Sequence, residues 1–269
     1  MTNDRKPARQ ASWDVLVDAP ADAVWEALTT GEGIANWFPP VASTSGEGVG
    51  SGVTFSWGEA MTWTSNVSEW EPGRHVQWMD DAAHMGPGAT LVADWTIESE
   101  GGKTRVRLVQ SGFGDDIAWD GFFEGTDIGW RYFLINLKRY VEDHRGRNRM
   151  MAWRRITCGI PREAAWKHLG QSLAGSAGFA AGDVVSLRVG DASVPARVEM
   201  VVPLRAMAFR IGGLANSLLF IELEGGAEFG VGIYLSVYDP AAAAQVEPAF
   251  KAQLESLSAS LAGPQAAAP

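Results

Sequence analysis

The chain has 269 residues, of which 46% are hydrophobic, and a formal net charge of −10. This length can bury one large core or two ordinary ones. Residues 1–146 carry 11 basic and 22 acidic side chains, a net charge of −11, whereas residues 147–269 carry 11 and 10, a net charge of +1. Neither half therefore has the basic surface that binding to nucleic acid or to an anionic membrane requires.

The cellular setting is indicated by features that the sequence lacks. A single cysteine, Cys158, excludes an internal disulfide framework. Residues 1–11 contain no apolar signal region, and no uninterrupted apolar run approaches membrane-spanning length. We therefore expect a soluble, cytoplasmic protein without a membrane partner.

The beginning of the chain predicts a strand followed by two short helices. Residues 12–18 alternate apolar and polar side chains, as a half-buried strand does. Pro20 suits the first turn of a helix over residues 21–28, and a second helical piece ends at residues 37–40. The Gly- and Ser-rich segment 43–52 is expected to be a flexible connection, because its glycines lack the spacing of a phosphate-binding loop.

Five further strands are expected before the last helix of this half. They cover residues 53–57, 61–70, 75–79, 90–98 and 103–110. The last two alternate clearly, which predicts an antiparallel sheet with one dry face and one wet face. Val67 and Trp70 are both apolar although they are three residues apart on one strand, which suggests a β-bulge there.

A helix of about five turns is predicted over residues 126–143. One stripe of this helix is strongly apolar and aromatic at 3.6 residues per turn. Its members are Trp130, Phe133, Leu134, Leu137 and Val141. The strands that precede the helix supply a sheet for this stripe to lie on.

Residues 12–144 contain several short motifs. They are Ala19-Pro20, Val24-Trp25-Glu26-Ala27-Leu28, Asn36-Trp37-Phe38, Val67-x-Glu69-Trp70-x-Pro72, Ser111-Gly112-Phe113, and Gly129-Trp130 with Leu137. Together with the order of elements, they resemble the START-like (SRPBCC, helix-grip) superfamily, in the branch related to the activators of heat-shock chaperone ATPase. The resemblance implies an α+β fold with a curved antiparallel sheet wrapped around a long C-terminal helix.

The second half of the chain echoes the first. Pro161 and Trp166 keep the five-residue step between Pro20 and Trp25. Residues 198–205 likewise resemble 67–74, Gly225-Gly226 resembles Gly101-Gly102, and residues 245–261 supply a last helix. This similarity predicts two helix-grip domains in tandem, 1–146 and 147–269, the second shorter and degenerate. The tail from Gly263 onward is expected to be disordered.

Ten of the twelve tryptophans lie in the first half, many of them where strands and helix face each other. These rings could simply fill a core, or they could line a pocket for an apolar or aromatic small molecule. The candidate ligand-binding residues are Trp37, Phe55, Trp57, Trp63, Trp78, Trp95, Leu108, Gln110, Phe122, Trp130, Phe133 and Leu134. Gln110 either faces inward, where it could orient a ligand, or reaches the strand end and faces water.

Candidates for chemistry are few. His75, Asp80, Asp81 and His84 are a conceivable metal set, but their loop lacks ordered spacing and no third histidine supports it. No serine, cysteine or threonine has a recognisable base signature beside it. We expect no catalytic residue, no metal and no cofactor.

The leading hypothesis is non-catalytic binding of a hydrophobic or aromatic small molecule in a cavity of the first domain. The resemblance implies ligands such as lipids or polyketide-like aromatics. It also leaves two alternatives, a polyketide cyclase-like enzyme and a chaperone-interaction module of the ATPase-activator type. A protein partner or a homodimer stays open.

Overall fold

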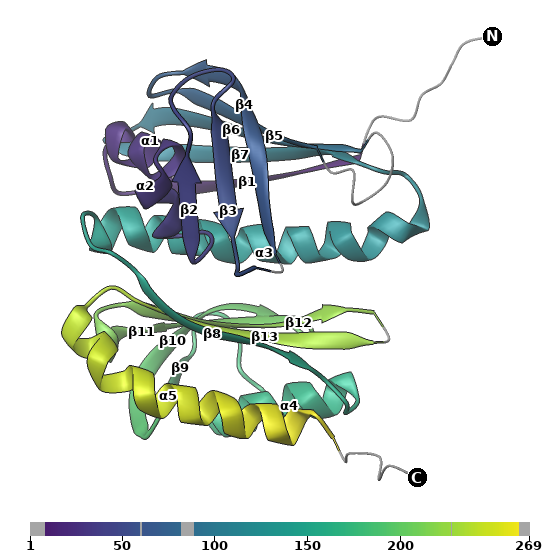
Figure 1. The fold of residues 1–269 in the computed structure, drawn as a ribbon. Helices are drawn as coiled ribbons and strands as arrows, with labels where there is room; N and C mark the ends of the chain where they lie inside the picture. The colour runs from purple at the N-terminus through teal and green to yellow at the C-terminus, as the bar shows by residue number, and fades with distance from the viewer. Residues whose placement is uncertain (1–8, 60, 82–88, 227, 264–269) are drawn as a thin grey trace. The chain divides into compact units, whose positions relative to one another are not determined.

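The computed structural model describes residues 9–59, 61–81, 89–226 and 228–263 (Figure 1). Within these residues the chain forms two antiparallel sheets, each followed by a long helix. It divides into two compact units, Met1–Gly146 and Arg147–Pro269. The fold class is α+β with two helix-grip units, as the sequence predicts. No helix in the described part of the chain is both long enough and apolar enough to cross a membrane.

The first unit is a seven-stranded antiparallel sheet wrapped around one long helix (Figure 1). Its elements are β1 (Arg9–Val17), α1 (Ala21–Thr29), α2 (Gly31–Ala35), β2 (Val41–Thr44), β3 (Gly52–Ser56), β4 (Thr62–Glu71), β5 (His75–Asp81), β6 (Thr90–Glu100), β7 (Lys103–Phe113), a 3-10 turn (Ile117–Trp119), α3 (Asp120–Arg139) and a π-helical turn (Tyr140–His144). The strand order is β1-β7-β6-β5-β4-β3-β2, so the first strand lies beside the last. The predicted β-bulge is confirmed by a shift in register between Val67 and Glu69 of β4.

The segment 43–52 is not the flexible connection that its composition suggested. Its first two residues belong to β2, which pairs with β3. The remainder is a hairpin loop with a hydrogen bond from the Ser45 N–H to the Gly52 carbonyl (2.9 Å). A second bond runs from the Val67 N–H of β4 to the Ser51 carbonyl (2.8 Å). The strand β2 has only four residues, too few for its alternation to be recognised, and the Gly- and Ser-rich composition of the loop after it is also typical of a linker.

The long helix α3 begins at Asp120, six residues before the predicted start at Thr126. Gly121 and Gly125 lie in the first turns of α3. Because glycine lowers the helix propensity of these turns, the sequence pattern did not predict them as helical. At the other end, the π-helical turn Tyr140–His144 continues the helix to about the predicted end.

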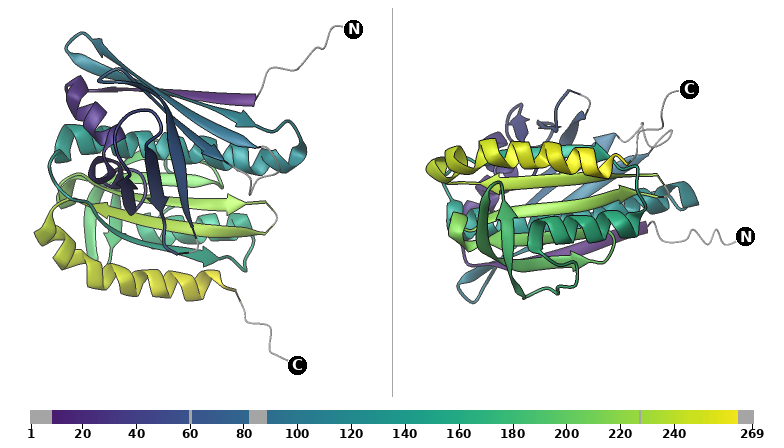
Figure 2. Two further views of the ribbon diagram at one scale, coloured as in Figure 1. Left: turned by 45° about the horizontal axis from the view of Figure 1, so that its top comes forward. Right: turned by 90° about the horizontal axis from the view of Figure 1, so that it is seen from below.

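The second unit is a six-stranded antiparallel sheet with two helices on one face (Figure 2). Its elements are β8 (Met150–Thr157), α4 (Arg162–Ala174), β9 (Val184–Val189), β10 (Ala192–Val202), β11 (Ala206–Ile211), a 3-10 turn (Gly212–Leu214), β12 (Ser217–Gly225), β13 (Phe229–Val237) and α5 (Pro240–Leu261). The strand order is β8-β13-β12-β11-β10-β9. Mainly Val, Leu and Ile side chains form its buried core with α4 and α5.

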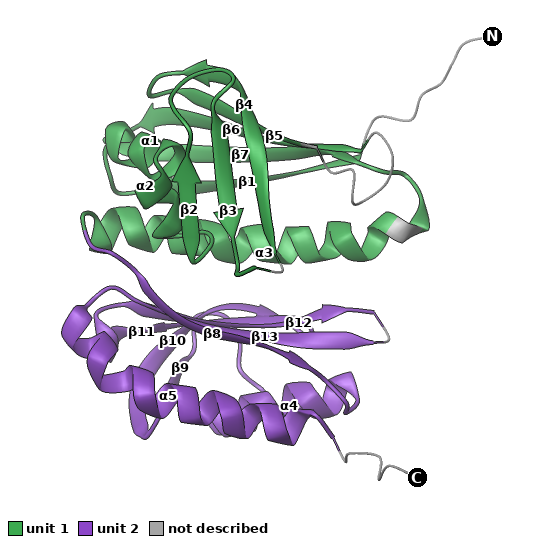
Figure 3. Cartoon of the chain, in the orientation of Figure 1, with its two compact units in different colours: residues 1–146 green, residues 147–269 purple. Residues whose placement is uncertain are grey.

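The two units, drawn in separate colours in Figure 3, share details beyond their strand order. Each sheet has a β-bulge at the equivalent point, after Val67 in β4 and after Val198 in β10. The N–H of each valine bonds to a loop carbonyl at 2.8 Å, that of Ser51 in one unit and Asp183 in the other. The second sheet has one strand fewer. That the second unit is a degenerate copy of the first stays a prediction. Residues 264–269 of the predicted disordered tail lie outside the described residues.

Candidate functional site

The inner face of the first sheet is defined by pairs of residues on neighbouring strands. Residues directly opposite each other in an antiparallel pair point to the same face. Trp78 of β5 lies opposite Ala93 of β6, which lies opposite Gln110 of β7. One step along the sheet, Trp95 lies opposite Leu108. All five side chains are at most 8% exposed, so this face is the dry one.

Aromatic side chains from the sheet and the helices meet on this inner face. They form one connected group, the aromatic cluster, with neighbouring ring centroids 4.7 to 6.4 Å apart. Its members are Trp37, Phe38, Phe55, Trp57, Trp63, Trp78, Trp95, Trp130 and Phe133. Trp95 lies at its centre, with its ring 5.6 Å from Trp37, 5.3 Å from Trp78 and 5.4 Å from Trp130.

Eight of the twelve predicted ligand-binding residues belong to this cluster, Leu108 and Gln110 lie beside it on the inner face, and two lie elsewhere. Phe122 lies in a smaller group beside the first turns of α3, 6.0 Å from Phe113 and 5.9 Å from Trp119. Leu134 is buried on the side of α3 that faces β1. It lines a surface hollow of about 280 Å³ there, together with Trp13 and other residues of β1 and α3.

Sequence reasoning missed Phe38 as a site residue, although it noted the motif that contains it. The Phe38 ring contacts Phe133 at 4.7 Å, Trp130 at 5.1 Å and Phe55 at 5.3 Å, and so connects helix to sheet. Phe38 follows α2 in an irregular segment, where neither helix nor strand periodicity assigns a face. The adjacent aromatic residue Trp37 was the available signal.

Gln110 is a polar residue of the inner face that joins the sheet to α3. Its side chain is 8% exposed, and its Oε1 accepts a hydrogen bond from the Trp130 Nε1–H. Of the two orientations that the sequence left open, the structure shows the inward one. The strand does not end at Gln110, because β7 continues to Phe113.

Two indole N–H groups of the cluster have no acceptor among the described residues. They belong to Trp78 and Trp95, whose side chains are 3% and 0% exposed. Trp37, equally buried, donates its Nε1–H to the Ala27 carbonyl at 2.8 Å. Buried donors in folded proteins are nearly always paired, and a missing partner costs about 1–3 kcal/mol. The cluster therefore has hydrogen-bonding capacity that the described protein atoms leave unused.

The conceivable metal set does not assemble among the described residues. His75 instead contacts two carboxylates, with its Nε2 3.1 Å from Asp94 Oδ1 and its Nδ1 3.6 Å from Glu69 Oε2. Gln77 donates to the other oxygen of Asp94 at 2.7 Å. His84 lies outside the described residues. Within the part of the chain that the structure covers, no three His, Cys, Asp or Glu side chains are grouped to hold a metal ion.

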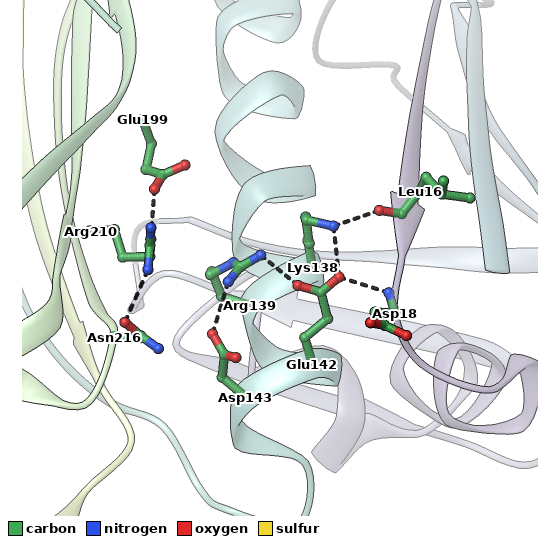
Figure 4. A network of polar contacts seen from close by, with 9 residues as sticks. All are labelled: Leu16, Asp18, Lys138, Arg139, Glu142, Asp143, Glu199, Arg210 and Asn216. Carbon is green, nitrogen blue, oxygen red and sulfur yellow. Dashed lines mark hydrogen bonds and ion pairs between the residues drawn. The ribbon is translucent and has the colours of Figure 1, made fainter. Parts of the chain in front are cut away.

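A charged network fixes the C-terminal end of α3 to β1 (Figure 4). Lys138 Nζ donates to the Leu16 carbonyl and to Glu142 Oε1, both at 2.6 Å. The Asp18 N–H donates to the same carboxylate at 2.7 Å, and Arg139 donates to its other oxygen. These bonds hold the helix in one position on the sheet, and so position its aromatic face.

Comparisons with known proteins agree with this architecture. Residues 18–142 match the family model described as activator of Hsp90 ATPase homolog 1-like protein. No curated protein matches the sequence.

Similar solved structures include single-domain and two-domain proteins. The Aha1 dimer from Colwellia psychrerythraea is 23% identical with a TM-score of 0.43, and the match covers 50% of this chain and 96% of that one. The di-domain ARO/CYC BexL from the BE-7585A biosynthetic pathway is 15% identical with a TM-score of 0.44, covering 97% and 100%. DynU16, from the dynemicin biosynthetic locus, is 17% identical with a TM-score of 0.42, covering 95% and 96%.

The family-model match lies entirely within the first unit, where the structure has the expected order of elements. A curved antiparallel sheet holds a long C-terminal helix, and the first strand pairs with the last. The first unit is therefore similar over residues 18–142 to this activator family, and it has the helix-grip fold that the resemblance to the START-like (SRPBCC) superfamily implies.

Proposed function

We propose that the first unit binds a hydrophobic or aromatic small molecule between its sheet and α3. The observation that carries this proposal is the aromatic cluster with its two unpaired indole N–H groups at Trp78 and Trp95. An interior that served stability alone would pair or omit such donors. Binding sites for small molecules are lined in this way, by apolar and aromatic side chains with a few polar groups.

The chemistry of the inner face favours binding through apolar contact. Its members on β5, β6 and β7 are mainly tryptophan and aliphatic residues, with Gln110 as the amide. Removing apolar ligand surface from water contributes about 25 cal/mol per Å², so contact with several rings gives useful affinity without a charged anchor. The proposal assigns binding to this site and no reaction.

The test is a titration of the full chain with the neutral dye Nile red, which fluoresces in apolar surroundings. We expect saturable binding to the unsubstituted protein. Trp130→Ala removes a ring of the cluster and should change the Kd by about tenfold or more, because it alters the contacts available to the dye. A direct search for the natural ligand is mass spectrometry of compounds extracted from the purified protein under denaturing conditions.

The matched control is Trp25→Ala on α1. The Trp25 ring packs edge-to-face on Trp70 at 4.8 Å and is not part of the aromatic cluster. Its removal should lower stability and leave the Kd for Nile red within about twofold. Absence of saturable binding, or equal changes of Kd in both variants, would contradict the proposed site.

A second candidate function is the activation of a chaperone ATPase, which the match of residues 18–142 to the activator family model favours. A chaperone activator should change the ATPase rate of an Hsp90-type chaperone when the two are mixed. The aromatic cluster is not needed for that role. Trp130→Ala should therefore leave such an activation unchanged while it alters dye binding.

A further inference from the structure

The unpaired polar groups of the aromatic cluster are all hydrogen-bond donors. The Nε1–H groups of Trp78 and Trp95 have no acceptor among the described residues, and their ring centroids are 5.3 Å apart. An indole nitrogen can donate but cannot accept. A partner that satisfies these groups must therefore bring an acceptor.

Gln110 adds a third donor beside them. Its Oε1 is occupied by the Trp130 Nε1–H. Because the indole is a donor only, the side-chain oxygen must face Trp130, and the NH₂ group must point away from it.

The sheet brings these donors close together. Trp78, Ala93 and Gln110 lie directly opposite one another on β5, β6 and β7, and Trp95 is two residues beyond Ala93 on the same face. Adjacent strands are about 4.8 Å apart, so the two outer residues of the row are separated by about 10 Å. The residue between them, Ala93, has only a methyl group.

We infer that the ligand of the first unit presents an uncharged oxygen acceptor, such as the carbonyl of an aromatic ketone or quinone, to the indole N–H groups of Trp78 and Trp95. Gln110 supplies a further N–H to the same molecule. This inference rests on the proposed function and narrows its ligand class. Hydrophobic compounds without an acceptor would leave the two donors unpaired and lose that part of the affinity.

The charges around the site favour a neutral acceptor over a carboxylate or phosphate. The residues that the register places on the inner face of β5, β6 and β7 include no Lys or Arg within the described chain. An anion buried among indole rings without a cation would not recover its lost hydration.

The experiment compares two probes of nearly equal size, indane and 1-indanone, by calorimetric titration of the full chain. 1-Indanone differs by one carbonyl group, which water solvates well, so a purely apolar site would prefer indane. We expect 1-indanone to bind at least as tightly as indane. In Trp78→Phe and in Trp95→Phe, affinity for 1-indanone should fall about five- to tenfold, and affinity for indane should hold.

The indole N–H resonances give a readout that a merely structural role would not move. In protein with ¹⁵N-labelled tryptophan, the Trp78 and Trp95 indole protons should shift downfield with 1-indanone and not with indane. The two Phe variants assign these resonances. Trp70→Phe is the control, because Trp70 packs on Trp25 and is not part of the cluster; it should leave both affinities unchanged.

The outcomes separate the inference from the proposed function. If neither probe binds the folded, unsubstituted protein, the proposed binding function is contradicted. If indane binds more tightly than 1-indanone and no indole proton shifts, the site binds small molecules without a hydrogen bond to a ligand acceptor. The inference is then wrong. The comparison on the unsubstituted protein decides this even if a variant fails to fold.

Discussion

Equally buried tryptophans of the first unit differ in their hydrogen bonding. Trp37 and Trp95 are both 0% exposed, and their rings touch at 5.6 Å. The Nε1–H of Trp37 has the Ala27 carbonyl as its acceptor, whereas that of Trp95 has none among the described residues. A comparison of Trp37 with Trp95 therefore separates the contribution of the hydrogen bond to the free energy of unfolding from the contribution of the buried ring.

We predict that Trp37→Phe costs more stability than Trp95→Phe. Both changes remove the same atoms from a buried ring, but only the first breaks a hydrogen bond and leaves a buried carbonyl without its donor. The difference should be about 1–3 kcal/mol in the free energy of unfolding. Urea denaturation of both variants measures it. Equal losses would show that Trp95 has an acceptor in solution, such as a buried water.

At the scale of elements, alternation and helical periodicity predict the strands of the first unit and the aromatic face of α3. They do not predict β2, whose four residues are too few to show a clear alternation, or the first turns of α3, where Gly121 and Gly125 lower the helix propensity. The candidate site, like the fold, is predicted in part from the sequence. Periodicity assigns Trp78, Trp95 and Trp130 to one interior, but pairing of their N–H groups depends on distances that no sequence pattern encodes.

The structure explains why the motif Ser111-Gly112-Phe113, at the end of β7, has glycine in its middle position. Gly112 has a φ of +91°, and a Cβ there would lie 1.9 Å from the Thr90 carbonyl oxygen. Only glycine allows this close approach of β7 to β6.

We predict that Gly112→Ala destabilises the protein by about 2 kcal/mol or more, because the backbone of one of the two strands must move. Gly121→Ala is the matched control. Gly121 lies within α3 with open space beside it, so alanine should add about 0.5–1 kcal/mol of stability. Thermal and urea melts compare the two variants. Loss of stability in both would contradict the role assigned to Gly112.

The end of α3 depends on pH through Glu142, whose side chain is 11% exposed. Burial by itself raises the pKa of this carboxyl group. Hydrogen bonds from Lys138 and the Asp18 N–H, with the charges of Arg139 and Lys138, outweigh burial and hold the pKa below its ordinary value of 4.5. A depressed pKa stabilises the fold above pH 4.5, and this stabilisation is lost as the pH falls through the folded-state pKa.

We predict that Glu142→Gln lowers the free energy of unfolding at pH 7 by about 1–3 kcal/mol, because the ionised carboxylate is the common acceptor of the network. The gap between variant and unsubstituted protein should narrow below pH 4.5. Glu247→Gln removes a more exposed i, i+4 pair with Lys251 and should cost at most about 0.5 kcal/mol. Urea melts from pH 3 to 7 follow both; a gap independent of pH would contradict the assignment.

On the scale of the whole molecule, the two units have one strand order and different interiors. Ten of the twelve tryptophans belong to the first unit. The core of the second is built mainly from Val, Leu and Ile, with Trp166 as its tryptophan. Aliphatic side chains interdigitate closely and contain no polar atoms that need partners. A common architecture therefore accommodates an aromatic cluster with unpaired indole N–H groups in one unit and a mainly aliphatic core in the other.

We predict that the fragment of residues 1–146 binds Nile red with a Kd within about threefold of the full chain, and that the fragment of residues 147–269 binds it at least about tenfold more weakly. Each fragment is one compact unit with its own sheet and C-terminal helix, so each has the elements that a separate fold requires. Circular dichroism and cooperative melting establish that the fragments are folded before titration. Trp130→Ala in fragment 1–146 should change its Kd as it does in the full chain. Equal binding by the two folded fragments, or binding by the full chain and by neither folded fragment, would show that the site does not reside in the first unit.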